Sequence, residues 1–377
     1  PRPDSLAGGA AMKRVRVLVV EDSLTIRRRF CECLAADPEI EVVGEAVDGK
    51  EAIERCRALR PDVVTLDMVL PVMSGLRATE YIMAYIPTPI LIVSASTNRG
   101  ELFKTYDALA AGAVDVLEKP SADDVDTEWA RRFTAAVKLV AKIKVITHPR
   151  ARLDASMRAG SLARTDSTTS FETTLPSERA YSILAFGAST GGPAAIVEIL
   201  RALPGGIRIP MLFALHIDKA FSAAFADWLD AQSAYAVELA LDRQPLDALA
   251  GKVIMAPPGQ HLVVSGGRLR LTNDPPRHSC RPSIDVLFES LALEHGSSVL
   301  ACLLTGMGRD GAAGLQAIRN AGGFTVAQDE ATSIVYGMPR EAALLGAAER
   351  ILPLPQIGLA IGQLLVRGKR AAARPSR

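Results

Sequence analysis

Residues 182–192 read SILAFGASTGG, a run of mostly apolar residues that enters a turn of small residues. Pro193 then opens an alanine-rich amphipathic segment, so the stretch predicts a strand, a tight turn and a helix. Gly187, Ser189 and Gly191 have the G-x-S-x-G spacing, which presents a serine hydroxyl on a sharp turn above a sheet. The same turn could cradle a dinucleotide phosphate at the helix N-terminus, or it could be a plain turn. The motif alone leaves these three interpretations open.

Length and composition indicate a globular protein of two domains. The chain has 377 residues, of which 49% are hydrophobic and 23% charged, and its net charge is +1. No apolar run reaches the roughly 18 residues of a membrane span, and no signal-peptide pattern opens the chain. We therefore expect a cytoplasmic protein without membrane insertion. The five cysteines are scattered without C-x-x-C spacing, which predicts neither a disulfide framework nor a zinc site.

Residues 13–146 alternate apolar, β-branched runs with segments of helical periodicity. This alternation predicts an α/β domain with a doubly wound, five-stranded parallel sheet covered by helices on both faces. The expected strands are Val15–Val20, Glu41–Ala46, Asp62–Leu66, Pro89–Val93 and Val114–Leu117. Ligands of such folds bind at the carboxyl ends of the strands, so the residues that follow each strand carry the functional information.

Charged and hydroxyl side chains follow four of these strands. They are Glu21 and Asp22 after the first strand, Asp67 after the third, Ser94 after the fourth and Lys119 after the fifth. Three carboxylates at one rim repel each other unless a hard cation joins them, and oxygen ligands suit Mg²⁺. An acceptor aspartate, a metal, a hydroxyl and a lysine are what phosphoryl transfer to a carboxylate requires. Each acid alone could be a helix cap, but the whole set favours phosphoryl chemistry.

With these strand ends, residues 15–141 resemble the receiver domain of response regulators. The matching pieces are VVEDS at 19–23, TLDM at 65–68, LPVMSG at 70–75, VSA at 93–95 and EKP at 118–120. The resemblance implies that Asp67 is phosphorylated. It also implies Mg²⁺ ligands and phosphoryl contacts, namely Glu21, Asp22 and Asp67 for the metal and Ser94 and Lys119 for the phosphoryl group. Receivers often carry an aromatic switch residue where Val116 stands here, which predicts altered coupling.

Two segments lack the patterns of a folded domain. Residues 147–179 are rich in Ser, Thr, Ala and Arg without a sustained apolar period, which predicts a flexible linker. Residues 1–11 have no periodicity and predict a disordered leader, with Met12 as a reasonable start of translation.

Residues 180–368 show a second alternation of strands and helices. The expected strands are Ile183–Phe186, Pro210–Leu215, Ala236–Ala240, Lys252–Ala256, Ser298–Leu304, Phe324–Gln328 and Arg350–Leu352. The segment 262–271 has a Gly-Gly centre that predicts a β-hairpin, so we expect a mostly parallel α/β domain with an added hairpin. Only three lysines (Lys219, Lys252 and Lys369) follow residue 180, and no basic stripe is present, which argues against DNA binding.

Three residues with different chemistry follow strands of this second domain, and we expect them at the same edge of its sheet. Ser189, His216 and Asp310 suit a nucleophile, a base and a carboxylate that orients the imidazole. The order Ser, His, Asp differs from that of the α/β-hydrolases, so a different fold is expected. The dinucleotide interpretation would assign Asp218 to a ribose, but it leaves Asp310 without a role and ranks second.

The remaining histidines have simpler interpretations. His148 lies in the expected linker, and His295 precedes a glycine at an expected helix end, where a cap role is favoured. His261 and His278 flank the hairpin, where they could line a groove, although ordinary surface positions are preferred.

Together these residues resemble the catalytic domain of the chemotaxis protein-glutamate methylesterases. The matching pieces are GASTGG at 187–192, His216, APPG at 256–259, HL at 261–262, PSIDVLF at 282–288 and TGMGRDG at 305–311. The resemblance implies a serine esterase with Ser189 as nucleophile, His216 as base and Asp310 as its orienting partner. The amide of Thr190, by its position after the nucleophile, and that of Met307, by the resemblance, are expected to bind the oxyanion.

The resemblance also implies the biological setting. It implies phosphorylation-activated hydrolysis of glutamate γ-methyl esters on chemoreceptor signalling helices, often with glutamine deamidation. A chemotaxis histidine kinase would supply the phosphoryl group, Mg²⁺ would serve the receiver, and the catalytic domain would need no cofactor. This family commonly has a Pro-Pro pair after the histidine, where Asp218-Lys219 stand here. The alternative is a receiver linked to a degenerate, esterase-like binding module or to a dinucleotide-binding domain.

Overall fold

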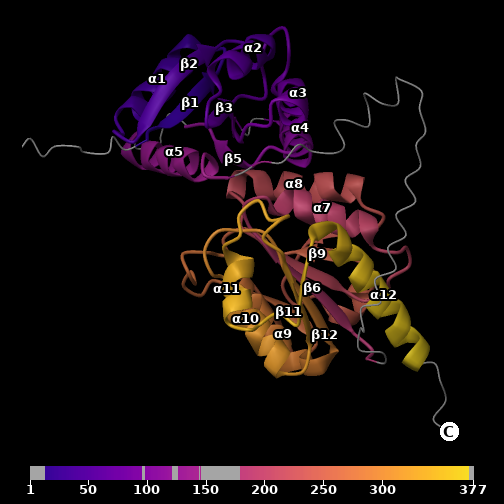
Figure 1. Cartoon of the computed structure of the whole chain (residues 1–377). Coiled ribbons are helices and arrows are strands. Elements are labelled where there is room, and N and C mark those ends of the chain that lie inside the picture. Colours follow the sequence, from indigo (N-terminus) through magenta and orange to yellow (C-terminus); the bar gives the residue numbers. More distant parts are fainter. Residues whose placement is uncertain (1–12, 96–97, 121–125, 144, 146–178, 373–377) are drawn as a thin grey trace, which may run out of the picture.

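The computed structural model describes residues 13–95, 98–120, 126–143, 145 and 179–372, and contains two separate sheets and one hairpin (Figure 1). The expected leader, nearly all of the expected linker and His148 lie outside these residues. Among the described residues, no helix combines the length and the apolar character needed to cross a membrane.

The first sheet has five parallel strands in the order β2-β1-β3-β4-β5. Its elements are β1 (Val15–Val20), α1 (Leu24–Ala35), β2 (Ile40–Ala46), α2 (Gly49–Leu59), β3 (Val63–Leu66), α3 (Gly75–Tyr85), β4 (Ile90–Ser94), α4 (Arg99–Ala110), β5 (Asp115–Glu118) and α5 (Asp126–Val140). Alternate residues of β1 enter different cores, because successive side chains of a strand point to opposite faces. Val17 and Val19 pack with α1 and α5, whereas Leu18 and Val20 pack with α2, α3 and α4. The predicted doubly wound sheet is confirmed.

The second sheet has seven parallel strands in the order β14-β13-β12-β6-β7-β9-β8. Its strands are β6 (Ile183–Ala188), β7 (Met211–Leu215), β8 (Val237–Leu239), β9 (Val253–Met255), β12 (Val299–Leu303), β13 (Phe324–Gln328) and β14 (Arg350–Leu352). The predicted hairpin is confirmed as β10 (His261–Ser265) and β11 (Arg268–Thr272), with Gly266 and Gly267 both at positive φ, as a two-residue turn of this kind requires. The predicted mostly parallel sheet with an added hairpin is therefore present.

Helices cover both faces of the second sheet, which leaves its carboxyl-end rim to carry the loops. One face packs against α7 (Gly192–Ala202), α8 (Lys219–Gln232) and α12 (Leu354–Ala372). The other face packs against α9 (Ile284–His295), α10 (Ala312–Asn320) and α11 (Met338–Leu344). Short 3₁₀ turns at Leu246–Leu249 and Gly296–Ser298 complete the domain.

The two domains share a packed contact between the lower edge of the first domain and α7 and α8 of the second (Figure 1). Tyr106 of α4 has its ring 5.2 Å from that of Phe225 and 5.5 Å from that of Trp228, and its hydroxyl donates to the Phe221 carbonyl. The Trp228 indole N–H donates to the Asp107 carboxylate at 2.9 Å. Large aromatic rings bury much apolar area, so this contact holds the first domain beside the second.

A matched pair on α9 tests the assigned core. Leu291 is fully buried, whereas Leu293 on the same helix is 87% exposed. We expect Leu291→Ala to lower the unfolding free energy of the second domain by about 2–5 kcal/mol, because it leaves a cavity. Leu293→Ala should change it by no more than about 0.5 kcal/mol. Urea unfolding followed by circular dichroism measures both, and equal effects of the two substitutions would contradict the orientation of α9.

Candidate active site

Adjacent parallel strands bring Ser189 and His216 to the same rim. Ala188 at the end of β6 pairs with Leu215 at the end of β7, and the His216 amide donates to the Ala188 carbonyl at 3.1 Å. The next residue of each strand is therefore Ser189 on one side and His216 on the other. Parallel strands end at one edge of a sheet, which is why residues 27 positions apart in sequence become neighbours.

The turn around Ser189 depends on glycines at two positions. Gly191 has φ +78°, a left-handed conformation that residues with a Cβ rarely adopt, and it caps the N-terminus of α7. A Cβ on Gly306 would lie 2.7 Å from the Ser189 Cβ, so only glycine lets the loop after β12 approach the serine. The Ser189 amide donates to the Thr305 carbonyl in this loop at 3.0 Å.

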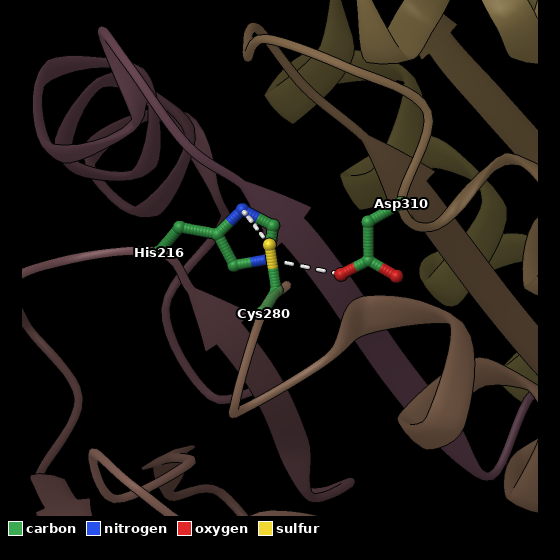
Figure 2. Close-up of side chains that lie close together, drawn as sticks. All are labelled: His216, Cys280 and Asp310. Atoms are coloured by element: carbon green, nitrogen blue, oxygen red, sulfur yellow. Dashed lines mark hydrogen bonds and ion pairs between the residues drawn. The ribbon is translucent and has the colours of Figure 1, made fainter. Parts of the chain in front are cut away.

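Asp310 lies at the end of the same loop and contacts His216. The His216 Nε2 and an Asp310 carboxylate oxygen are 2.9 Å apart (Figure 2). Asp310 is 2% exposed and also accepts hydrogen bonds from the Ser283 hydroxyl at 2.7 Å and the amides of Ile284 and Asp285 at 2.7 and 3.1 Å. These donors form the N-terminus of α9, where free amides and the helix dipole favour an anion.

The two partners shift each other's pKa in opposite directions. Burial by itself raises the pKa of Asp310, but hydrogen bonds from His216, Ser283 and Ile284 outweigh it and lower the pKa below its ordinary value. For His216, burial disfavours the imidazolium, yet the hydrogen bond to Asp310, with a smaller contribution from Cys280, raises the pKa to about 9. The pair therefore stabilises a proton on the imidazole.

Some of the predicted contacts are present and others are not. Within the described residues, no hydrogen bond joins the Ser189 hydroxyl to His216, although the strand register makes them neighbours. Met307 is 58% exposed at the rim, and Thr190 is 8% exposed beside Ser189. The Thr190 hydroxyl donates to the receiver's Asp115 carboxylate at 3.0 Å, a contact that the sequence did not predict.

The positions of the other histidines show that one prediction from the sequence is wrong. His261 was predicted at the surface, but it is fully buried, because β10 packs against α9; its Nδ1 accepts from the Ser283 amide at 3.0 Å. His278 is exposed and lies 3.2 Å from the Asp285 carboxylate. His295 ends α9 before Gly296, which has φ +49°, so the predicted helix end is confirmed.

Sequence reasoning missed two residues that contact the His216–Asp310 pair. Ser283 precedes an apolar helical run, which is the pattern of an N-cap, so its place at the start of α9 could have been predicted. Cys280 has its sulfur 3.7 Å from the His216 Nδ1. No motif marks Cys280, because the contact arises from a loop that folds back over the rim.

The receiver rim gathers its predicted charges as well. The Lys119 ammonium lies 2.8 Å from a Glu21 carboxylate oxygen and 2.9 Å from one of Asp67. Carboxylate oxygens of Glu21, Asp22 and Asp67 lie within 4.8 Å of one another. Burial raises the pKa of both Glu21 and Asp67, and Lys119 opposes this effect. Clustered oxygen donors with buried charge fit a hard divalent cation such as Mg²⁺.

Ser94 differs from the rest of this set. It is 1% exposed, and its hydroxyl donates weakly to the Ala95 carbonyl at 3.5 Å rather than to Asp67. The Met68 amide donates to the other Asp67 oxygen at 2.7 Å.

Comparison with protein families identifies both halves of the chain. Residues 17–128 match the response regulator receiver domain, and residues 184–361 match the CheB methylesterase domain. The protein is therefore a response regulator whose output domain is a methylesterase.

Similar proteins narrow the class further. The chain is 42% identical to protein-glutamate methylesterase/protein-glutamine glutaminase 2 of Anaeromyxobacter dehalogenans, over 96% of this chain and 99% of that protein. It is 41% identical to the protein of that name from Nitrosospira multiformis, over 93% and 97%. The solved CheB methylesterase catalytic domain of Thermotoga maritima is 30% identical, with 49% of this chain covering 99% of it at a TM-score of 0.47. The chain belongs to the protein-glutamate methylesterase/protein-glutamine glutaminase family, and it is an enzyme of the methylesterase type.

The His216–Asp310 pair predicts an unusual titration. Nuclear magnetic resonance of the His216 ring should show a pKa of about 9, and Asp310→Asn should lower it, because the largest interaction that opposes burial is then lost and only the contribution of Cys280 remains. A raised folded-state pKa stabilises the fold fully below about pH 6.5, and this stabilisation is lost as the pH rises through about 9. A His216 pKa at or below the ordinary value in the unsubstituted protein would contradict the assigned pair.

Proposed function

We propose that this protein hydrolyses glutamate γ-methyl esters on the signalling helices of chemoreceptors by acyl transfer through Ser189, His216 and Asp310. The observation that carries this proposal is the His216–Asp310 pair, 2.9 Å apart, at the strand end next to Ser189. A serine, an imidazole and a buried carboxylate in neighbouring loops are the groups that ester hydrolysis through a covalent intermediate needs. The family names of the relatives agree with an ester of glutamate as substrate.

Each residue then has one chemical role. Asp310 accepts at Nε2, so in the neutral imidazole, the form that grows as the pH rises toward 9, Nδ1 of His216 is the nitrogen that takes the proton from Ser189. The Ser189 oxygen attacks the ester carbonyl, and the proton on His216 passes to the departing methanol. Water then attacks the acyl-enzyme, His216 takes its proton, and Ser189 is released with the glutamate carboxylate. The same route with ammonia as leaving group converts glutamine to glutamate.

The oxyanion of the tetrahedral intermediate needs donors at the rim. The amide of Thr190 follows the nucleophile directly, and the amide of Met307 lies in the loop whose Thr305 carbonyl binds the Ser189 amide. We assign both as oxyanion donors, each worth about 3–4 kcal/mol in the transition state. The proposed reaction requires no cofactor in this domain.

The receiver would control this site through phosphorylation of Asp67 by a histidine kinase. Glu21, Asp22 and Asp67 would hold Mg²⁺, which supplies positive charge to balance the incoming phosphoryl group. Lys119 already contacts Glu21 and Asp67, so it is placed to bind a phosphoryl oxygen after transfer. The Ser94 hydroxyl would turn from the Ala95 carbonyl to do the same.

Two contacts between the domains join receiver residues to residues close to Ser189 and His216 in sequence. Asp115 opens β5, the strand that leads to Lys119, and its carboxylate accepts from Thr190, the residue after the nucleophile. Arg132 of α5 forms an ion pair at 2.7 Å with Asp218, two residues after His216. We propose that phosphorylation shifts the end of β5 and loosens these contacts, which opens the rim to a helical substrate. Val116, with no aromatic ring to move, limits how strongly the shift is coupled.

We also propose that residues 13–146 form the receiver domain, that residues 180–368 form the catalytic domain, and that residues 147–179 link the two. The proposed substrate and phosphodonor place the reaction in the cytoplasm, on the cytoplasmic domains of chemoreceptors.

Ser189→Ala tests the nucleophile. We expect methanol release from methylated receptor membranes to fall by at least about 10³-fold, because no acyl-enzyme can form. Ser297→Ala, at an exposed serine of the same domain, is the matched control and should retain the full rate. Near-normal release by Ser189→Ala would contradict the triad. Saturable NAD binding together with that result would favour the dinucleotide interpretation, and the absence of both activities would favour a degenerate binding module.

Adding a small-molecule phosphodonor and Mg²⁺ tests whether phosphorylation regulates the esterase. We expect methanol release by the full chain to rise at least tenfold, which needs a shift of only about 1.4 kcal/mol between closed and open states. Asp67→Asn should abolish both phosphorylation and the increase, whereas a chain starting at residue 180 should be fast without a donor. If the full chain and the shorter chain were equally fast and a donor changed neither, the receiver would have no inhibitory role.

A further inference from the structure

Arg309 is an exposed arginine of the catalytic rim whose charge is not balanced by a carboxylate. It directly precedes Asp310 and lies three residues after Gly306, which packs against Ser189. In the part of the chain that the structure describes, no ion pair links its guanidinium to an acidic side chain. A positive charge is therefore free for a ligand next to the proposed catalytic residues.

Two other arginines of this region already have partners. Arg277 forms a two-pronged ion pair with Glu289 of α9, with distances of 2.5 and 2.8 Å. Arg281 donates from Nη1 to two backbone carbonyls at 3.2 and 3.3 Å. Arg309 differs, because its one hydrogen bond within the described residues uses the Nε–H group. The four N–H groups on its two Nη atoms remain for a ligand.

A histidine and a buried aspartate hold this arginine in place. The Arg309 Nε–H donates to Nδ1 of His278 at 3.2 Å, so the ring proton lies on Nε2, which donates to the Asp285 carboxylate at 3.2 Å. Asp285 is fully buried where α9 meets α10, and its other oxygen accepts from the Gly314 amide at 2.7 Å. The direction of the guanidinium is thus fixed from the core of the domain.

The backbone around His278 is also held in a definite shape. His278 and Ser279 have φ of +50° and +62°, and backbone hydrogen bonds of 3.1 and 2.8 Å between Arg277 and Cys280 close the turn around them. Two consecutive non-glycine residues in the left-handed region cost free energy, and such strain persists only where the surroundings enforce it. The turn therefore has one conformation, and it places the ring that supports Arg309.

The guanidinium lies close to the reacting groups. A ring nitrogen of His278 and a carboxylate oxygen of Asp310 lie within 4.8 Å of each other, and Asp310 contacts His216 at 2.9 Å. Two side chains therefore connect Arg309 to His216. A helix presents the same face again after one or two turns, about 5 or 11 Å along its axis, which covers a distance of this size.

We propose that Arg309 determines specificity by binding a carboxylate of the substrate helix one or two turns from the reacting ester. This inference rests on the proposed function, because it requires a helical substrate. The fork of an arginine can bind a carboxylate through two parallel, charge-assisted hydrogen bonds. The proposed reaction itself produces such groups, since each hydrolysed ester leaves a carboxylate on the helix. His278 acts through Arg309 and is a positioning residue.

Two matched helical peptides test the selectivity. Each carries a single glutamate γ-methyl ester, and the positions four and seven residues to either side hold aspartate in one peptide and asparagine in the other. With the full chain, Mg²⁺ and a phosphodonor, we expect kcat/KM for methanol release to be about threefold to tenfold higher for the aspartate peptide. Arg309→Gln should bring this ratio to about one, and Arg309→Glu should reverse it.

Controls separate recognition from general damage. Arg208→Gln, at an exposed arginine shortly before β7 and thus at the opposite edge of the sheet, should keep the ratio of the unsubstituted protein. His278→Ala should lower the ratio, whereas a merely structural role would lower the rates for both peptides equally. High salt should lower the ratio as well. A ratio near one in the unsubstituted protein, or an unchanged ratio in Arg309→Gln, would overturn the role of Arg309.

Binding is measured separately from chemistry. In a full chain with Ser189→Ala, fluorescence anisotropy should show tighter binding of the aspartate peptide, and adding Arg309→Gln should remove the difference. If this difference held but the unsubstituted chain released no methanol, the proposed hydrolysis would be wrong and the recognition of carboxylates by Arg309 would stand. Equal binding of the two peptides, or no binding of either, would overturn the role of Arg309, while methanol release would still support the proposed function.

Discussion

The buried carboxylate of Asp310 is the constraint on which the catalytic rim depends. An unpaired buried charge costs several kcal/mol, so this carboxylate must be matched by donors from the rest of the fold. Those donors come from the end of β7 through His216 and from the start of α9 through Ser283 and two amides. Pairing one anion thereby fixes the relative positions of three chain segments that lie far apart in sequence.

The receiver also contains buried carboxylates, but they are paired differently. In the part of the chain that the structure describes, Lys119 is the one cation within 3 Å of the buried carboxylates of Glu21 and Asp67, so the rim retains negative charge and can accept a hard cation. Asp310, in contrast, is surrounded by donors, and His216 is one of them. The first arrangement suits a site whose charge changes with phosphorylation, whereas the second suits a site whose geometry must stay constant between turnovers.

One contact between the domains lies next to Ser189, so the proposed regulation by the receiver would act beside the proposed catalytic serine. The Thr190 hydroxyl bonds the receiver's Asp115, and the preceding residue is Ser189. In the proposed regulation, a movement of β5 would therefore reach Ser189 over one residue, without the need for a long path of side chains. The aromatic contact of Tyr106 with Phe225 and Trp228 keeps the domains together while this smaller contact forms or breaks.

The alternation of apolar runs and helical periods was sufficient to predict both sheets, and the Gly-Gly centre at 266–267 predicted the hairpin. The alternation also predicted the rim positions of Ser189, His216, Asp310, Asp67 and Lys119, because the carboxyl ends of parallel strands meet at one edge. It did not predict the buried position of His261, the bond from Ser283 to Asp310, or the contact of Cys280 with His216. The last two features depend on how the segment between β11 and α9 folds back over the rim, whereas His261 is buried because β10 packs against α9. Strand periodicity carries no information about that path, so only the tertiary structure decides it.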